Sequence, residues 1–140
     1  MGGQTQHSVR ACVPFTTFLE CAMNHTLTLL ELVLQLHGEF RSCLAPIRVT
    51  PLQAGVILFL HRHANATLTD AATALRLTLP TMSVVVNDLV RKRWVTKRRS
   101  VTDTRVVCLS LSRRGQALAH KIEGQVRRVS TQIKYKIVAK

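Results

Sequence analysis

The spacing of apolar residues changes near Trp94, and this change constrains the fold of the 140-residue chain more than any other feature. Before Trp94, apolar side chains recur at three- and four-residue steps, as they do along helices. Thr69 is expected to cap a short helix, Asp70–Leu75, and Thr78 to cap a second helix, Leu79–Arg93. Only three residues separate the two, which is typical of a helix-turn-helix.

Beyond Trp94 the sequence is typical of strands. Val95–Arg99 is expected to form a strand, Ser100–Asp103 a turn and Arg105–Leu111 a returning strand. A hairpin directly after a helix-turn-helix is a wing. Ser112 is then expected to cap a final helix, and the sequence leaves open whether the C-terminal region is one helix or two.

The first third of the chain predicts two further helices. Residues 14–45 are predicted to form one long helix that is apolar on more than one side. Such a helix must be covered on several faces, and a second copy of the chain could supply part of that cover. Pro46 ends it, and Thr50-Pro51-Leu52-Gln53 opens the next helix with the residues of a capping box, to about His63. We therefore predict a single, mainly α-helical domain with a small β-wing.

The net charge of +13 is confined to one part of the chain. Residues 1–90 hold five basic and five acidic side chains, whereas residues 91–140 hold fifteen basic ones against Asp103 and Glu123. Seven basic residues fall within Arg91–Arg105. Such a density suits a polyanion, either nucleic acid or an acidic membrane surface, although a basic face kept for solubility is the plainer alternative.

The second helix of the helix-turn-helix has two different faces at about 100° per residue. Its apolar face is expected to pack on the core and consists of Leu79, Met82, Val85, Val86, Leu89 and Val90. Its other face carries groups that can read base edges in a major groove: Pro80, Thr81, Ser83, Val84, Asn87, Asp88 and Arg91. An ordinary polar surface helix is the alternative interpretation of this face.

Basic residues on either side of Trp94 could grip the sugar-phosphate backbone, in which case binding would weaken steeply with salt. They are Arg91, Lys92, Arg93, Lys97, Arg98 and Arg99. Arg105, after the wing turn, could enter the adjacent minor groove. Asp103 is expected to orient Arg105 or the turn, since a carboxylate facing DNA would be repelled.

Several short motifs in this order resemble the multiple antibiotic resistance regulator (MarR) family of bacterial winged-helix proteins. They are Thr50-Pro51-Leu52-Gln53, Leu68-Thr69-Asp70-Ala71-Ala72, Pro80-Thr81-Met82-Ser83, Asp103-x-Arg105 and Leu109-Ser110-Leu111-Ser112-x-x-Gly115. The resemblance implies dimerisation helices in residues 1–45 and 112–140, which interleave in an obligate homodimer, and a DNA-binding lobe over residues 46–111. It also implies two lobes on a pseudo-palindromic operator of double-stranded DNA.

By the same resemblance, Pro80, Thr81, Ser83, Val84 and Asn87 match the base-reading face of the family, and Arg105 matches its wing-tip arginine. The family commonly has Arg at the positions of Val84 and Asp88, so base preference does not transfer. Arg93 stands where a glycine usually ends the reading helix, in a position that favours a left-handed backbone. A small-molecule effector is also implied.

Other chemistry is weakly signalled. Cys12 and Cys21 could sense oxidants, but buried structural thiols are the plainer interpretation. His61 and His63 are poor co-ligands because positions i and i+2 on a helix point apart, so no metal site is predicted, even with His37 and Glu39 nearby. No catalytic motif is found, and we expect neither an enzyme nor a cofactor.

We expect a cytoplasmic protein, because no leader or membrane span is recognised in the sequence. The expected function is sequence-specific transcriptional regulation by a homodimeric repressor that a small ligand or an oxidant releases from its operator. The alternative is a basic winged helix that binds nucleic acid without sequence preference, or that binds an acidic partner.

Overall fold

The computed structural model describes residues 29–138, and the chain divides into two compact units, 1–36 and 37–140. Helix α2, Leu29–Leu44, crosses from one unit to the other. The part of the predicted first helix that precedes residue 29 lies outside the described residues. A 3-10 helix, Ala45–Ile47, follows α2 and contains Pro46, which confirms where the first helix was expected to end.

Helix α3, Pro51–Arg62, begins at the predicted capping box. The N–H of Gln53 donates to Thr50 Oγ1 at 3.2 Å, and the N–H of Thr50 donates to Gln53 Oε1 at the same distance. Two backbone donors that the helix leaves free are thereby satisfied by side chains. The helix ends at Arg62 with His63 as its C-cap, in agreement with the predicted end near His63.

Helices α4, Leu68–Ala74, and α5, Leu79–Arg91, form the helix-turn-helix. The expected cap of the first was wrong by two residues: Thr67, not Thr69, caps α4, because only Thr67 stands three positions before Asp70 and completes a capping box. Thr78 caps α5 as predicted and accepts a hydrogen bond from the N–H of Thr81.

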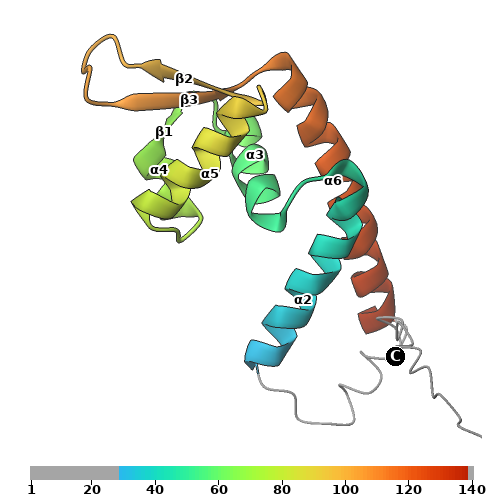
Figure 1. The fold of residues 1–140 in the computed structure, drawn as a ribbon. Coiled ribbons are helices and arrows are strands. Elements are labelled where there is room, and N and C mark those ends of the chain that lie inside the picture. Colours follow the sequence, from blue (N-terminus) through green and yellow to red (C-terminus); the bar gives the residue numbers. More distant parts are fainter. Residues whose placement is uncertain (1–28, 139–140) are drawn as a thin grey trace, which may run out of the picture. The chain divides into compact units, whose positions relative to one another are not determined.

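A three-stranded antiparallel sheet carries the wing, in the order β1-β3-β2 (Figure 1). Strand β2 is Val95–Arg99 as predicted, whereas β3, Val107–Leu111, begins two residues later than expected. In the register of the hairpin, Val95 pairs with Leu111 and Arg99 with Val107. Strand β1, Ala66–Thr67, was not predicted; it pairs with Leu109 and Cys108 of β3.

Helix α6, Arg113–Val138, is one continuous helix, which answers a question that the sequence left open. Ser112 precedes it, and its Oγ accepts a hydrogen bond from the N–H of Gly115 at 3.1 Å, so Ser112 caps the helix. The same Oγ donates to the carbonyl of Arg93 at 2.7 Å. The end of the wing is therefore tied to its beginning.

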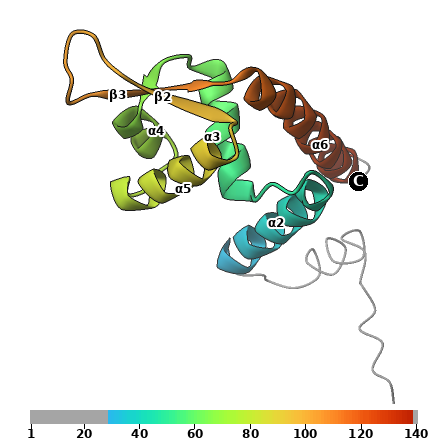
Figure 2. The ribbon, with the colours of Figure 1, turned by 45° about the horizontal axis from the view of Figure 1, so that its top comes forward.

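The core lies where α3, α5, the sheet and the first half of α6 meet. Side chains from each are fully buried: Val56 and Ile57 of α3, Met82, Val86 and Leu89 of α5, Leu109 of β3, and Ile122 of α6. Figures 1 and 2 both show the β2–β3 hairpin projecting beyond the helices of this core. Among the described helices, none alone is long and apolar enough to cross a membrane, although the bent pair Val33–Ile47 and Pro51–Arg62 together meets that test.

Candidate nucleic-acid interface

The inner face of α5 holds the helix rigidly against the core. Met82, Val86 and Leu89 are fully buried, as the helical period predicted. Leu79 was expected among them but is 49% exposed, because it begins the helix at the edge of the core. Rigid packing of one face fixes the spacing of the side chains on the other.

The outer face of α5 presents small polar and apolar groups to solvent. Pro80, Thr81 and Asn87 are exposed, Val84 is 69% exposed, and Ser83 is half-buried. All five residues that the family resemblance assigned to base reading are thus at least partly accessible.

Asp88 does not belong with that face, although the helical period placed it there. Its Oδ2 accepts a hydrogen bond from Gln53 Nε2 of α3 at 2.6 Å, and Lys92 Nζ lies 3.1 Å from the same oxygen. Its Oδ1 accepts from Arg91 at 3.2 Å. Asp88 therefore joins α5 to α3. Its partner Gln53 is buried, and the sequence did not predict that this residue would contact α5.

Lys97 of the wing donates a hydrogen bond to Asn87 Oδ1 of α5. The sequence assigned Lys97 to phosphate contacts and Asn87 to base contacts, whereas the structure brings the two together. Recognition of adenine by Asn uses both ends of the amide group. Lys97 and a base would consequently compete for the same oxygen.

The wing carries cations on both faces of its edge strand. Only Val95 of β2 is buried; Lys97, Arg98 and Arg99 are exposed. Near the base of the wing, Lys92 Nζ lies 5.1 Å from the centre of the Trp94 ring, a cation–π contact. Trp94 is half-buried and packs against the core.

Asp103 organises the wing turn through backbone contacts. Its Oδ1 accepts from the N–H of Arg105 at 2.9 Å, and its carbonyl accepts from the N–H of Val106 at 3.0 Å. The carboxylate thus holds the turn that carries Arg105. Arg105 itself is exposed.

Helix α5 ends at Arg91, two residues before its predicted end. Arg93, just beyond it, adopts a left-handed backbone with φ of 60°, as the family resemblance led us to expect. Arg76, in the turn between α4 and α5, does the same with φ of 54°. For residues other than glycine this conformation costs about 1–2 kcal/mol. At Arg93 the chain turns sharply from α5 into the wing, and the N–H of Trp94 donates back to the carbonyl of Leu89 at 3.0 Å.

A cavity of about 510 Å³ opens between the start of α5 and the wing. Its lining combines the first turn of α5 with the wing turn, and consists of Thr67, Leu68, Thr69, Leu79, Pro80, Ser83, Arg105, Val106 and Val107. Arg105 is the charged side chain of this lining. The exposed reading face and the wing turn therefore border one hollow.

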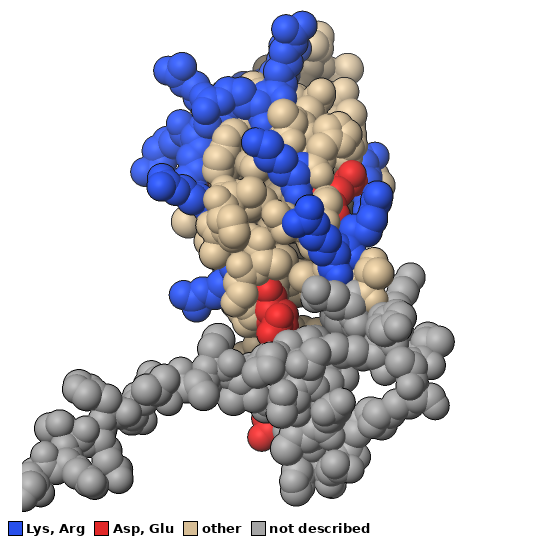
Figure 3. All heavy atoms as spheres, turned by 90° about the vertical axis from the view of Figure 1, so that its right-hand side faces the viewer, with Lys and Arg blue, Asp and Glu red and all other residues tan. Residues whose placement is uncertain are grey.

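Basic side chains are not restricted to the wing. Figure 3 shows the side of the molecule on which α6 lies, where lysines and arginines outnumber acidic side chains. The exposed basic residues of α6 are Arg113, Arg114, Lys121, Arg127 and Arg128. Part of the charge that the sequence concentrates beyond residue 90 thus lies away from the wing.

The candidate redox residues Cys12 and Cys21 lie outside the described residues. Of the other cysteines, Cys43 is half-buried, and burial together with the nearby carboxylate of Glu39 raises the pKa of its thiol. A raised pKa lowers the share of reactive thiolate. Cys43 therefore does not have the character of an oxidant sensor.

Comparison with known proteins supports the resemblance. Residues 49–106 match the sequence model of the MarR family, and no curated protein matches the chain. The fold is similar to that of wild-type MarR from E. coli in its apo form, with a TM-score of 0.70 and 22% identity, covering 80% of this chain and 86% of that one.

Two DNA-bound structures are also similar. The transcriptional repressor CouR bound to a 23-mer DNA duplex has a TM-score of 0.69 and 24% identity, covering 79% of this chain and 87% of that one. The S. aureus MepR–DNA complex has a TM-score of 0.61 and 22% identity, covering 78% and 91%. These likenesses confirm the predicted winged-helix fold.

Proposed function

We propose that this chain, whose residues 49–106 match the MarR family, is a transcriptional regulator that binds double-stranded DNA with sequence specificity. The observation that carries the proposal is the pairing of two surfaces. One is the exposed, nearly uncharged face of α5 with Thr81, Val84 and Asn87; the other is the cationic wing beside it. Neither surface alone would favour sequence-specific binding over plain attraction to a polyanion.

Helix α5 reads the major groove in this proposal. Asn87 pairs with an adenine, Thr81 and Ser83 reach base edges or phosphates, Val84 contacts a thymine methyl, and Pro80 lies at the first turn. The buried inner face of α5 supports this role because it fixes where these side chains stand. On binding, Asn87 exchanges its bond with Lys97 for bonds to the base.

The wing supplies affinity. Lys97, Arg98, Arg99 and Arg91 contact phosphates, and Arg105, held on a turn by Asp103, enters the minor groove. Arg91 also pairs with Asp88, but its side chain is 78% exposed and can reach a phosphate without leaving the helix surface. Each phosphate contact releases counterions, so affinity falls with salt.

We further propose a homodimer that acts as a repressor. Leu30, Val33 and Leu34 of α2 are exposed apolar side chains on one helix, which is the kind of surface that a second copy covers. Two lobes on a pseudo-palindromic site would meet two half-sites one helical turn apart. A small-molecule effector or an oxidant that changes the spacing of the lobes would release the DNA.

The DNA-bound relatives support the assignment by fold. CouR is described as a transcriptional repressor bound to a duplex, and a mutant of MarR from E. coli has been solved in complex with operator DNA. The exposed basic residues along α6 favour a second candidate function, which is binding to nucleic acid without sequence preference.

Replacing Asn87 with Ala separates the two candidates. Sites selected from random duplex DNA by the unaltered protein should show a symmetric consensus, and Asn87→Ala should lose about 1–3 kcal/mol of discrimination at an adenine position. Lys97→Gln is the matched control, because it removes the same hydrogen bond but should weaken binding to all sequences alike. Without a consensus from the unaltered protein, or with an unchanged consensus from Asn87→Ala, sequence reading by α5 would be refuted.

A further inference from the structure

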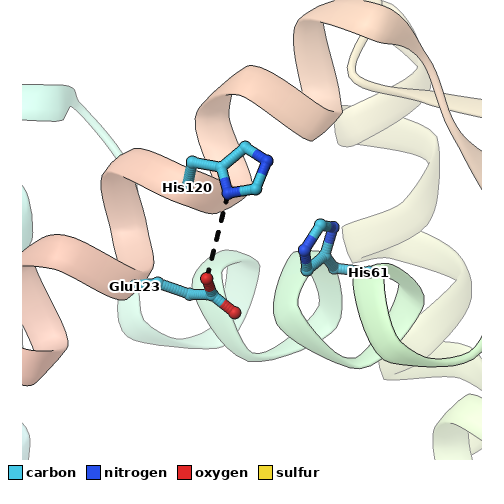
Figure 4. A group of neighbouring side chains, drawn as sticks. All are labelled: His61, His120 and Glu123. Atoms are coloured by element: carbon cyan, nitrogen blue, oxygen red, sulfur yellow. Dashed lines mark ion pairs between the residues drawn. The ribbon is translucent and has the colours of Figure 1, made fainter.

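Three side chains from two helices converge at a place that DNA binding does not use. His61 lies in the last turn of α3, while His120 and Glu123 lie about one turn apart on α6. Figure 4 shows all three side chains pointing toward one space between the helices. One nitrogen of each histidine and one oxygen of Glu123 all lie within 4.8 Å of one another. Sequence reasoning paired His61 with His63 and predicted no metal site, because the partners on α6 are distant in the chain.

The core fixes where these groups stand. Each follows a buried residue: Leu60 before His61, Ala119 before His120, and Ile122 before Glu123. These neighbours belong to one hydrophobic cluster, so α3 and α6 cannot shift apart without exposing it. Residues three apart on a helix share a face, which explains why His120 and Glu123 point the same way.

Small rotations of these three side chains would bring their ligand atoms close enough to bind one metal ion. His120 Nδ1 lies 4.0 Å from Glu123 Oε2, and the rings of His61 and His120 meet edge to face with centroids 5.0 Å apart. Metal–ligand bonds of about 2.0–2.2 Å require the three ligand atoms to approach one another further. The side chain of His120 is 68% exposed and that of Glu123 is 32% exposed, so both have room to turn.

A ligand set of two imidazoles and one carboxylate favours transition-metal ions over Mg²⁺ and Ca²⁺. Zn²⁺ and related transition metals favour imidazole nitrogen, whereas Mg²⁺ and Ca²⁺ favour oxygen alone. Sites with three protein ligands keep a fourth position for water. His63 is not a member, since its ring packs against Phe59 with centroids 4.7 Å apart.

We propose that His61, His120 and Glu123 bind one Zn²⁺ ion, or a related divalent transition metal, and that the ion clamps α3 to α6. The proposal does not rest on DNA binding. The ion joins the winged-helix lobe, through the last turn of α3, to the helix that follows the wing.

The test uses the full chain after removal of metal by a chelator. Zn²⁺ affinity is measured by competition with a chromophoric chelator, and Co²⁺ absorption reports whether nitrogen and oxygen or thiolate sulfur bind the ion. We expect one site without thiolate ligands, and a melting temperature that rises with Zn²⁺ because the ion binds the folded state. His120→Gln should weaken Zn²⁺ binding by more than about tenfold and remove the rise in melting temperature.

Two further variants keep the result interpretable. Glu123→Gln should also weaken binding, while His63→Gln is the matched control and should bind as the unaltered protein does. Circular dichroism verifies that each variant folds. Lack of Zn²⁺ uptake by the unaltered chain, a thiolate spectrum, or equal affinity in His120→Gln would overturn the proposal.

Discussion

Helix α5 and the β2–β3 wing are neighbours along the chain, yet they are built in opposite ways. Three side chains of α5 are fully buried and its outer face is almost uncharged. By contrast, β2 buries only Val95 and exposes three consecutive cations. The two regions meet through Lys97 and Asn87, so they form one surface.

This difference separates two requirements of DNA recognition. Discrimination between bases needs side chains at fixed spacing, which a helix packed on a core provides. Attraction to phosphates needs charge but little precision, which an exposed hairpin provides. Under the proposed function, α5 therefore determines the sequence that is bound, and the wing determines how tightly any sequence is bound.

Removing the charge of β2 should have the largest effect on DNA binding. In a Lys97→Gln, Arg98→Gln and Arg99→Gln variant, the slope of log affinity against log salt should become shallower by about 3, one for each lost phosphate contact. At about 0.1 M salt this corresponds to roughly 100-fold weaker binding or more. Fluorescence anisotropy with one duplex at several salt concentrations measures both quantities.

A matched triple variant on α6 tests whether the position of the charge matters. Lys121→Gln, Arg127→Gln and Arg128→Gln removes the same charge from exposed positions of α6 beyond its first two turns. Its salt slope should stay close to that of the unaltered protein. Equal losses in the two variants would mean that the wing is no more than one part of a diffuse basic surface.

Gly115 offers a test of how the wing is attached to α6. A Cβ at Gly115 would lie 2.0 Å from the carbonyl oxygen of Trp94, at the junction between α5 and the wing. Because that oxygen is backbone, Gly115→Ala should cost about 1–3 kcal/mol of the free energy of unfolding. Urea titration followed by Trp94 fluorescence measures the change.

Gly124 is the control within the same helix, since a Cβ there meets nothing within 4 Å. Gly124→Ala should raise the free energy of unfolding by up to about 1 kcal/mol, because alanine favours the helix interior. If both variants had the same stability, close packing at the base of the wing would be ruled out.

Low pH should weaken the N-terminal cap of α4 but not that of α5. This is expected to be the smallest of the three effects. Hydrogen bonds from Thr67, first from its side chain and then from its backbone N–H, lower the pKa of Asp70 from its ordinary value of 3.8. Asp70 therefore adds stability that is present above about pH 3.8 and is lost as the pH falls through its lower folded pKa. Asp70→Asn should flatten this part of the acid-unfolding curve, measured by circular dichroism.

The cap of α5 provides the internal comparison, because Thr78 and Thr81 do not titrate in this range. Thr78→Ala should lower stability by a similar amount across the acid range, in contrast to Asp70→Asn. An acid-unfolding curve that Asp70→Asn leaves unchanged would contradict the role given to this carboxylate.

Local signals explain most of what the sequence predicted about the fold. The capping box of Thr50 and Gln53, the cap at Thr78 and the strand Val95–Arg99 were all predicted because their partners lie within a few residues. The cap of α4 was misplaced although its signal was also local: Thr67 stands three residues before Asp70, which is the spacing that a capping box needs. Strand β1 was missed because two residues carry no periodicity and its partner is the distant strand β3.

Long-range contacts account for the errors at the site. Helical period alone placed Asp88 on the outer face, but Gln53 of α3 draws it toward the core. The bond between Lys97 and Asn87 likewise joins a helix and a strand whose mutual position no local pattern determines. His61 was compared with its neighbours in sequence, whereas α6 brings His120 and Glu123 to it.

The place of β2 at the edge of the sheet has a consequence for self-association. An edge strand leaves one row of backbone N–H and C=O groups unpaired, which can template a strand from another molecule. Lys97, Arg98 and Arg99 lie along that edge, and like charges on two such edges would repel. The side chains proposed to bind phosphates therefore also disfavour pairing between this edge and the same edge of a second molecule.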